Sequence, residues 1–183
     1  DQAVAFIDAC ATDDDHRPFV LSLSFTAPHD PRTPPAGQPE ITARAERIDL
    51  PPNVLSVHPF DNGEMTIRDE ELISWPRRPA DLREEIARYD LMIENMDAGI
   101  GRVLAALTRQ GLDDDTVIIF AGDHGLAIGS RGLLGKQNLY EHSMRSPLIV
   151  VGPGFPAGTT RDGFAYLHAL PATVPAAAAL ATP

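Results

Sequence analysis

TVIIFAGDHGLAIGSRGLLGK, residues 116–136, is the stretch of sequence that decides the fold. It opens with the apolar, β-branched run Thr116–Phe120, which is typical of a strand buried on both faces of a parallel sheet. Asp123 and His124 follow this run side by side. In open α/β sheets, ligands bind just beyond the carboxyl ends of the strands. A carboxylate and an imidazole at that place, on a glycine-rich loop that ends at Lys136, predict a metal site that faces an anion.

The same residues also allow plainer interpretations. An Asp-His pair after a strand is often an ordinary turn with a helix cap, and runs of glycine are commonly just loop. A nucleotide-binding loop, in contrast, is excluded by the spacing. The segment from Gly129 to Lys136 has one residue too many for G-x-x-x-x-G-K, and Gln137 stands where that motif requires Ser or Thr.

Length and composition are those of one soluble globular domain. The chain has 183 residues, of which 43% are hydrophobic and 22% charged. Its net charge of −11 argues against nucleic acid or an anionic membrane surface as a general partner. Cys10 is the only cysteine, so an internal disulfide and a thiolate metal cluster are both excluded.

The sequence carries no membrane span and no targeting segment that we recognise. No stretch approaches the roughly twenty apolar residues that a span requires. The chain opens on Asp1-Gln2, without a methionine or a basic region typical of a signal peptide. We therefore expect the sequence to begin within a longer protein.

The first part of the chain predicts a helix, a strand and a histidine on a stiff loop. Apolar residues at helical spacing indicate an amphipathic helix over residues 1–13, and Pro18–Phe25 is typical of a buried strand. His29 follows that strand between Pro28 and Pro31, which restrict the loop. A histidine presented in this way suits a proton donor or an anion contact, and an ordinary surface histidine fits equally well.

The middle of the chain predicts a long loop followed by a long helix. Residues 31–80 are rich in Pro, Arg and acidic residues without periodicity, which is typical of a functional loop or an insertion. We expect this segment to wrap the surface near the site entrance, with His58 and Trp75 as candidate substrate contacts. Residues 79–110 carry apolar positions at three- and four-residue steps and predict a helix that packs on the sheet.

The remaining elements complete the prediction of the fold. Pro147–Val151 is typical of another buried strand, residues 164–168 of a further strand, and residues 172–180 of a short helix. The order helix, strand, long loop, helix, strand, loop, strand predicts an α/β fold with a mostly parallel sheet flanked by helices.

Several separated blocks of the sequence resemble one known family. They are PFVLSLSFTAPHDPRTP, YDLMIENMDAGIGRVLAAL, TVIIFAGDHG and GLLGKQNLYEHSMRSPLIVVGPG, in this order. The chain resembles the sulfatases of the alkaline phosphatase superfamily from its start to about residue 155. The resemblance implies an alkaline-phosphatase-like fold truncated at the N-terminus. Residues 1–183 would then form part of a catalytic domain, with a surface loop or insertion at 31–80 and a divergent tail at 156–183.

The resemblance also implies roles for individual residues. Asp123 and His124 would be ligands of a divalent metal, with Ca²⁺ as the usual ion, although a nitrogen ligand is unusual for so hard a cation. Lys136 would contact a sulfate oxygen, which suits a point charge on a flexible stem. His29 would hydrogen-bond the ester oxygen and help to protonate the leaving alcohol. Gly122 departs from the Ser or Thr that is common in the family.

The nucleophile of this family is not found in the sequence. Sulfatases use a formylglycine made from Cys or Ser in a C/S-x-P-x-R motif, and paired upstream aspartates bind the same metal. Cys10 is followed by Ala-Thr-Asp-Asp and does not fit the motif. We therefore expect the formylglycine and the paired aspartates upstream of Asp1, and we predict that the chain alone is inactive.

The resemblance indicates a sulfuric ester hydrolase that acts on a small-molecule or carbohydrate sulfate ester. It also implies an exported or periplasmic protein. The net charge argues against a nucleic acid or membrane partner, and we make no prediction of oligomeric state. Two alternatives stay open at this point. One is a phosphoester or phosphonate hydrolase of the same superfamily, because sulfate and phosphate are both tetrahedral anions. The other is a non-catalytic, degenerate relative.

Overall fold

The computed structural model describes residues 2–12, 17–37, 40–61 and 63–178. The chain divides into two compact units, each of which is assembled from separate stretches of the sequence. Unit 1 comprises Asp1–Phe19, Leu104–Asp123 and Ser146–Pro183, and unit 2 comprises Val20–Val103 and His124–Arg145. Each unit is described by itself. None of the helices in the described part of the chain is both long enough and apolar enough to span a membrane.

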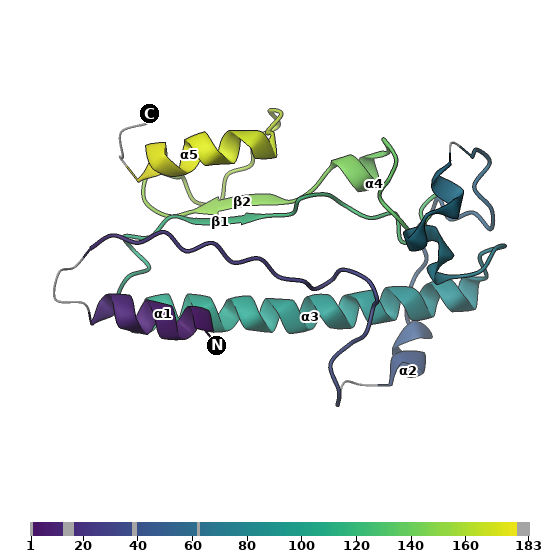
Figure 1. Ribbon diagram of the computed structural model, residues 1–183, viewed down its shortest axis with the longest axis horizontal. Coiled ribbons are helices and arrows are strands. Elements are labelled where there is room, and N and C mark those ends of the chain that lie inside the picture. The colour runs from purple at the N-terminus through teal and green to yellow at the C-terminus, as the bar shows by residue number, and fades with distance from the viewer. Residues whose placement is uncertain (1, 13–16, 38–39, 62, 179–183) are drawn as a thin grey trace. The chain divides into compact units, whose positions relative to one another are not determined.

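Unit 1 contains the first helix and the end of the longest one. Helix α1, Gln2–Ala11, confirms the helix predicted near the start, and it buries Ile7. Helix α3, Pro79–Arg109, confirms the predicted long helix, and its last residues lie beside α1 (Figure 1). The Asp8 carboxylate accepts hydrogen bonds from Arg109 at 2.6 Å and from Gln110 at 2.7 Å. These bonds lower the pKa of Asp8, with Gln110 as the larger cause.

Unit 1 also contains the sheet, which differs from the prediction. Strands β1, Ile118–Ala121, and β2, Leu148–Val151, lie side by side (Figure 1) and pair antiparallel, with Phe120 opposite Ile149. They are the only strands in the described residues, so a mostly parallel sheet is not confirmed. Pro18–Phe25, predicted as a strand, pairs with no neighbour. The predicted burial is also wrong, since Val20, Ile149 and Val151 are more than half exposed. An apolar, β-branched run indicates an extended segment but specifies neither its burial nor the direction of its partner.

The tail of unit 1 is helical where a strand was predicted. Residues 164–168 do not form a strand, since Leu167–Ala169 is a 3-10 turn, η3, that leads directly into helix α5, Leu170–Ala177. Pro171 lies in the first turn of α5. A backbone N–H in the first turn has no partner within the helix, so its absence in proline costs nothing there, and the fixed φ of proline favours a helix start. The predicted end of this helix, residues 179–180, lies outside the described residues.

Unit 2 is built from short helices and loops against the first part of α3. Its short elements are α2, Ile41–Ala45; the 3-10 turns η1, Glu64–Thr66, and η2, Arg68–Leu72; and α4, Glu141–Met144. A small core forms where Ile73, Leu82 and Leu134 pack together, with Leu50, Val54 and Leu72 around them. Segment 31–80 therefore does more than wrap a surface, because it supplies core residues to unit 2.

Candidate active site

His29 lies in unit 2, and one of its ring nitrogens contacts the next residue, Asp30. The backbone N–H of His29 donates to the carbonyl of Thr26 at 2.9 Å, which closes the loop into a turn. Its Nδ1 lies 2.8 Å from the backbone carbonyl of Asp30 and 3.1 Å from Asp30 Oδ1. Because a carbonyl oxygen only accepts, Nδ1 carries the hydrogen. In the neutral ring Nε2 is therefore left with its lone pair.

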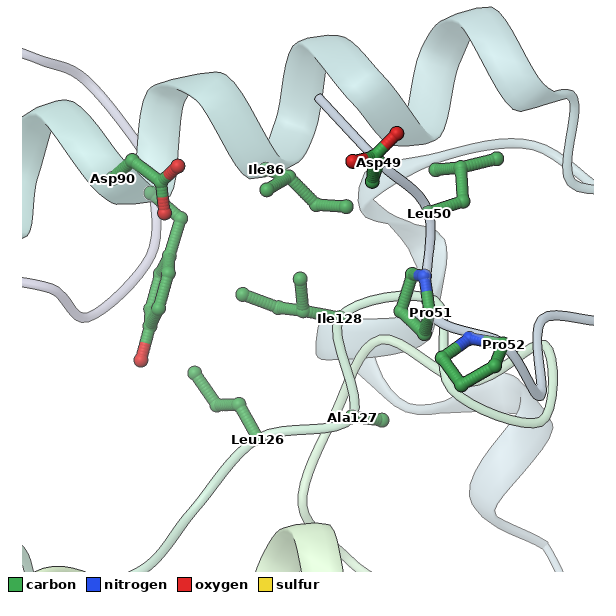
Figure 2. Close-up of a pocket in the computed structure, with 10 residues that line it drawn as sticks. Asp49, Leu50, Pro51, Pro52, Ile86, Asp90, Leu126, Ala127 and Ile128 are labelled. Atoms are coloured by element: carbon green, nitrogen blue, oxygen red, sulfur yellow. The ribbon is translucent and has the colours of Figure 1, made fainter. Parts of the chain in front are cut away.

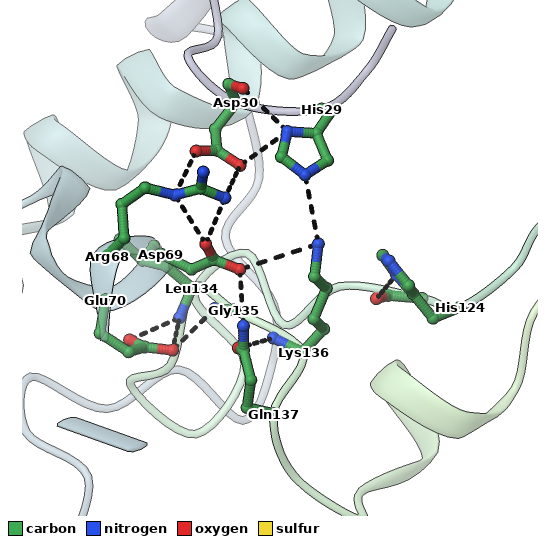
Figure 3. Close-up of polar contacts among 11 residues, drawn as sticks. His29, Asp30, Arg68, Asp69, Glu70, His124, Leu134, Gly135, Lys136 and Gln137 are labelled. Carbon is green, nitrogen blue, oxygen red and sulfur yellow. Dashed lines mark hydrogen bonds and ion pairs between the residues drawn. The ribbon is translucent and has the colours of Figure 1, made fainter. Parts of the chain in front are cut away.

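Lys136 meets that second nitrogen. Lys136 Nζ lies 3.5 Å from His29 Nε2 and 3.9 Å from Asp69 Oδ2 (Figure 3). The two predicted catalytic residues are 107 positions apart in the sequence, and the structure brings them together. When Nε2 also carries a hydrogen, a cation and an imidazolium at this separation can engage one small anion, the first through its charge and the second through a hydrogen bond.

Two carboxylates and one guanidinium support this pair. Arg68 donates from Nε to Asp30 Oδ2 at 3.0 Å and from Nη2 to Asp30 Oδ1 at 3.1 Å. The same Nη2 donates to Asp69 Oδ1 at 3.0 Å, and Gln137 Nε2 donates to Asp69 Oδ2 at 3.1 Å. Arg68 thereby links the carboxylate beside His29 to the carboxylate beside Lys136 (Figure 3). We call these five side chains, His29, Asp30, Arg68, Asp69 and Lys136, the anion network.

Asp69 is ionised in this environment. Its side chain is only 5% exposed, and burial by itself would raise the pKa of the carboxyl. The hydrogen bonds from Gln137 and Arg68, together with the charge of Lys136, outweigh burial and lower the pKa below its ordinary value. Asp69 is therefore a fixed negative charge next to Lys136.

A buried ion pair holds the loop that carries Lys136. Glu70 accepts hydrogen bonds from the backbone N–H of Leu134 at 2.9 Å and of Gly135 at 2.7 Å. Arg77 Nη2 donates to Glu70 at 2.6 Å, and Arg77 Nε donates to the carbonyl of Gly132 at 3.2 Å. A Cβ on Gly135 would lie 2.7 Å from Gln137 Oε1 and 3.0 Å from Glu70 Oε1, so a side chain does not fit there. The carboxylate and the guanidinium together fix the path of the chain into Lys136.

The two predicted metal ligands fall at a boundary between the units. Asp123 follows β1 and belongs to unit 1, whereas His124 is the first residue of the second stretch of unit 2. His124 Nδ1 lies 3.0 Å from the carbonyl of Gly125. Across the described ranges, no group of three or more His, Cys, Asp or Glu side chains is placed to hold a metal ion. One carboxylate and one imidazole do not make a complete site, so we derive no step through a metal from this geometry.

His58 and Trp75, the predicted substrate contacts in segment 31–80, make contacts inside unit 2. His58 is 5% exposed, and its Nδ1 lies 2.8 Å from the carbonyl of Arg131. The guanidinium of Arg77 stacks over the Trp75 ring at 3.5 Å from the centroid. Both residues therefore help to hold the segment in place.

Unit 2 also contains an open pocket of about 480 Å³. Leu50, Pro51, Ile86 and Ile128 are among the residues that line it, and Asp49 and Asp90 place carboxylates at its wall (Figure 2). Burial raises the pKa of Asp90, Glu94 adds to this effect, and Arg44 opposes it.

Sequence reasoning missed the residues around His29 and Lys136. Asp30, Arg68, Asp69, Glu70 and Arg77 were not predicted as site residues. The signal that could have found them is the run Arg68-Asp69-Glu70 with Arg77 nearby, inside a segment that also supplies apolar residues. Charge runs are usually solvated, whereas here Asp69 and Glu70 are 4% and 1% exposed.

Comparison with known proteins identifies the family. The Sulfatase family model matches residues 1–179, and the chain therefore belongs to the Sulfatase family. This confirms the resemblance seen in the sequence. Choline-sulfatase of Rhizobium meliloti (strain 1021) is 33% identical over an alignment of 157 residues, and the match covers 80% of this chain and 29% of that protein. The multifunctional alkaline phosphatase superfamily protein PehA of Trinickia caryophylli is 30% identical over 167 residues, covering 82% of this chain and 32% of that protein.

A solved structure shares the fold. The crystal structure of a candidate sulfatase, yidJ of Bacteroides fragilis, matches with a TM-score of 0.58 at 24% sequence identity. The match covers 83% of this chain and 30% of that chain. The chain thus has the fold of part of a sulfatase, and it spans about 30% of the length of the relatives that it matches.

Proposed function

We propose that this chain is part of a sulfuric ester hydrolase and supplies the residues that bind the sulfuryl group and protonate the leaving alcohol. The observation that carries the proposal is the approach of Lys136 Nζ to within 3.5 Å of His29 Nε2. Membership of the Sulfatase family supports the reaction class. The substrate is a sulfate ester of a small molecule or a carbohydrate.

Lys136 and His29 have complementary roles in this proposal. Lys136 binds a sulfuryl oxygen and offsets the negative charge that builds there in the transition state. His29, when protonated on both nitrogens, keeps Nδ1–H directed at Asp30 and gives the Nε2 proton to the leaving oxygen. The electron pair of the breaking S–O bond goes to that oxygen, so a neutral alcohol leaves.

The proposal also includes a nucleophile and a metal ion. The nucleophile and some of the metal ligands come from outside this chain. We infer a formylglycine contributed by a longer polypeptide, and a divalent cation, with Ca²⁺ as the expected ion. Asp123 and His124 would be two of its ligands, and further ligands are required. When bound, such a cation neutralises charge on the sulfuryl oxygens. Export of the longer protein is also part of this proposal.

A second candidate is a phosphoester or phosphonate hydrolase. The relative PehA, described as a multifunctional member of the alkaline phosphatase superfamily, favours keeping it. Both anions are tetrahedral, so Lys136 and His29 suit either. Matched aryl sulfate and aryl phosphate rates of the full-length enzyme distinguish the two candidates.

The test begins with the polypeptide as its native source makes it. Peptide mass mapping should find upstream peptides, including one with an aldehyde in a C/S-x-P-x-R motif. The purified full-length enzyme should hydrolyse an aryl sulfate, and the 183-residue chain alone should not. A native chain without such a motif, or turnover by the isolated chain, would contradict the proposal.

Variants of the full-length enzyme test the residue roles. Lys136→Ala should lower kcat/KM by about 10²–10³-fold, since it removes a charge that acts on the transition state. Glu94→Gln is a matched control, because Glu94 is exposed on α3 and pairs with Arg44, outside the anion network. Equal activity of the Lys136 variant and the control would refute the assigned role.

A further inference from the structure

The anion network holds as much negative as positive formal charge. Two cations, Arg68 and Lys136, alternate with two carboxylates, Asp30 and Asp69, through contacts of 3.0 to 3.9 Å. A site intended for the most highly charged anions would leave its lysine uncompensated. Here a buried carboxylate lies directly beside the lysine.

We propose that Asp69 is a specificity-determining residue that weakens binding of doubly charged tetrahedral esters at the Lys136 site more than it weakens binding of singly charged ones. This inference rests on the proposed function, because it takes Lys136 as the anion contact. A sulfate monoester carries one negative charge, whereas a phosphate monoester above its second pKa of about 6 carries two. At the same distance, Asp69 repels the doubly charged phosphate monoester about twice as strongly as the singly charged sulfate monoester.

Asp69 is held where it can act in this way. Its side chain is 5% exposed, and Arg68 and Gln137 each bond to it, at 3.0 Å and 3.1 Å. It therefore cannot swing into solvent when an anion arrives. Lys136 is bound less tightly, since its contacts with Asp69 and His29 are 3.9 Å and 3.5 Å long. The lysine can turn to an incoming oxygen while the carboxylate stays in place.

The size of the effect follows from Coulomb's law. An anion that accepts a hydrogen bond from Lys136 at about 3 Å lies about 7 Å from Asp69 when it binds on the far side of Nζ. At a water-like dielectric constant, one charge pair at about 7 Å changes affinity about threefold. Removing the Asp69 charge should thus improve binding of a monoanion about threefold and of a dianion about ninefold. The preference between them should shift about threefold.

The experiment measures binding to the 183-residue chain by NMR. Phenyl sulfate and phenyl phosphate are titrated at pH 8, and dissociation constants are taken from the shifts of the Gly135 and Lys136 amides and the His29 ring. The quantity compared is the ratio of the dissociation constant of phenyl phosphate to that of phenyl sulfate. Asp69→Asn should lower this ratio about threefold. Glu94→Gln removes the same unit of charge outside the network and should leave the preference unchanged.

A second comparison separates the charge of the ester from its central atom. Phenyl methylphosphonate is a monoanion at pH 8, so comparing it with phenyl phosphate changes the charge while the central atom stays phosphorus. Asp69→Asn should improve binding of phenyl phosphate about threefold more than binding of the phosphonate, and an equal improvement of both would overturn the inference.

The outcomes separate the inference from the function on which it rests. Binding of both esters at the Lys136 site, with a preference that Asp69→Asn does not alter, overturns the role of Asp69 and leaves the proposed function standing. Absence of any shift at Gly135, Lys136 and His29 with either ester overturns the inference, whereas the proposed function is judged by the aryl sulfate rate of the full-length enzyme.

Discussion

Replacing Glu70 by Gln should test whether the buried ion pair holds the loop that carries Lys136. The side chains of Glu70 and Arg77 are 2% and 0% exposed, and their ion pair is 2.6 Å long. Burial lowers the pKa of Arg77 and the charge of Glu70 opposes this, so the pair stabilises the charged guanidinium. Gln is nearly isosteric, but it leaves the buried guanidinium without a counter-charge. Loss of one partner of a buried pair costs about 3–5 kcal/mol, and we expect the free energy of unfolding to fall by that amount.

Urea unfolding followed by tryptophan fluorescence is a direct assay. Trp75 is the only tryptophan, and its ring lies 3.5 Å from the Arg77 guanidinium, so the signal reports on this region. Asp81→Asn is the matched control, because its ion pair with Arg78 is largely exposed and should contribute about 1 kcal/mol or less. An unfolding free energy of Glu70→Gln within about 1 kcal/mol of the wild-type value, at equal m-value, would refute the reasoning.

Three further predictions concern unit 2. Gly125→Ala should destabilise the chain by about 1–3 kcal/mol, because a Cβ there would collide with the carbonyl of His142. Gly101→Ala on α3 is the control, since its Cβ would meet open space and the substitution should be neutral or stabilising. Thermal unfolding compares the two variants. Leu134→Ala should cost about 2–5 kcal/mol in urea unfolding, since Leu134 is fully buried in the small core, and a cost under about 1 kcal/mol would contradict that packing. Burial, with the charges of Arg131 and His58, lowers the pKa of His142 below its ordinary value of 6.5, so the unfolded chain binds this proton at a higher pH than the folded chain does. The free energy of unfolding should therefore fall as the pH drops below about 6.5. In urea unfolding at a series of pH values, His142→Gln should make this fall between pH 7 and pH 5 less steep.

Local patterns predicted the helices well and the sheet poorly. The apolar spacing of residues 79–110 predicted α3 almost to its ends, because a helix is stabilised by contacts within a few residues. The run at Thr116–Phe120 overlaps β1 and the run at Pro147–Val151 contains β2, but their antiparallel pairing was not foreseen. Strand direction depends on a partner chosen across the fold, and the sequence of one strand does not record it. Pro18–Phe25 has the composition of a strand but pairs with no other strand, because its composition also does not specify a partner.

In the candidate site, the sequence predicted the two chemically active residues but not the residues that support them. His29 and Lys136 were predicted because their residue types and settings suit proton transfer and anion binding, and they lie 3.5 Å apart. The residues that hold them were hidden, because Arg68-Asp69-Glu70 has the composition of a solvated turn. Burial of the carboxylates of Asp69 and Glu70 depends on hydrogen-bond donors from Leu134 to Gln137, more than 60 positions away.

Segment 31–80 is a structural part of unit 2 and not a separable surface insertion. A surface insertion can be shortened or exchanged at little cost, because it contributes few buried contacts. Segment 31–80 instead contributes buried charges to the loop of Lys136 and apolar residues to the core of unit 2. The buried carboxylates Asp69 and Glu70 receive their hydrogen bonds from Leu134, Gly135 and Gln137 only when the loop is in place, and the same bonds hold the path of the loop. Segment and loop therefore form one cooperative structure, so substitutions that remove either side of it should disturb the position of Lys136 without touching Lys136 itself.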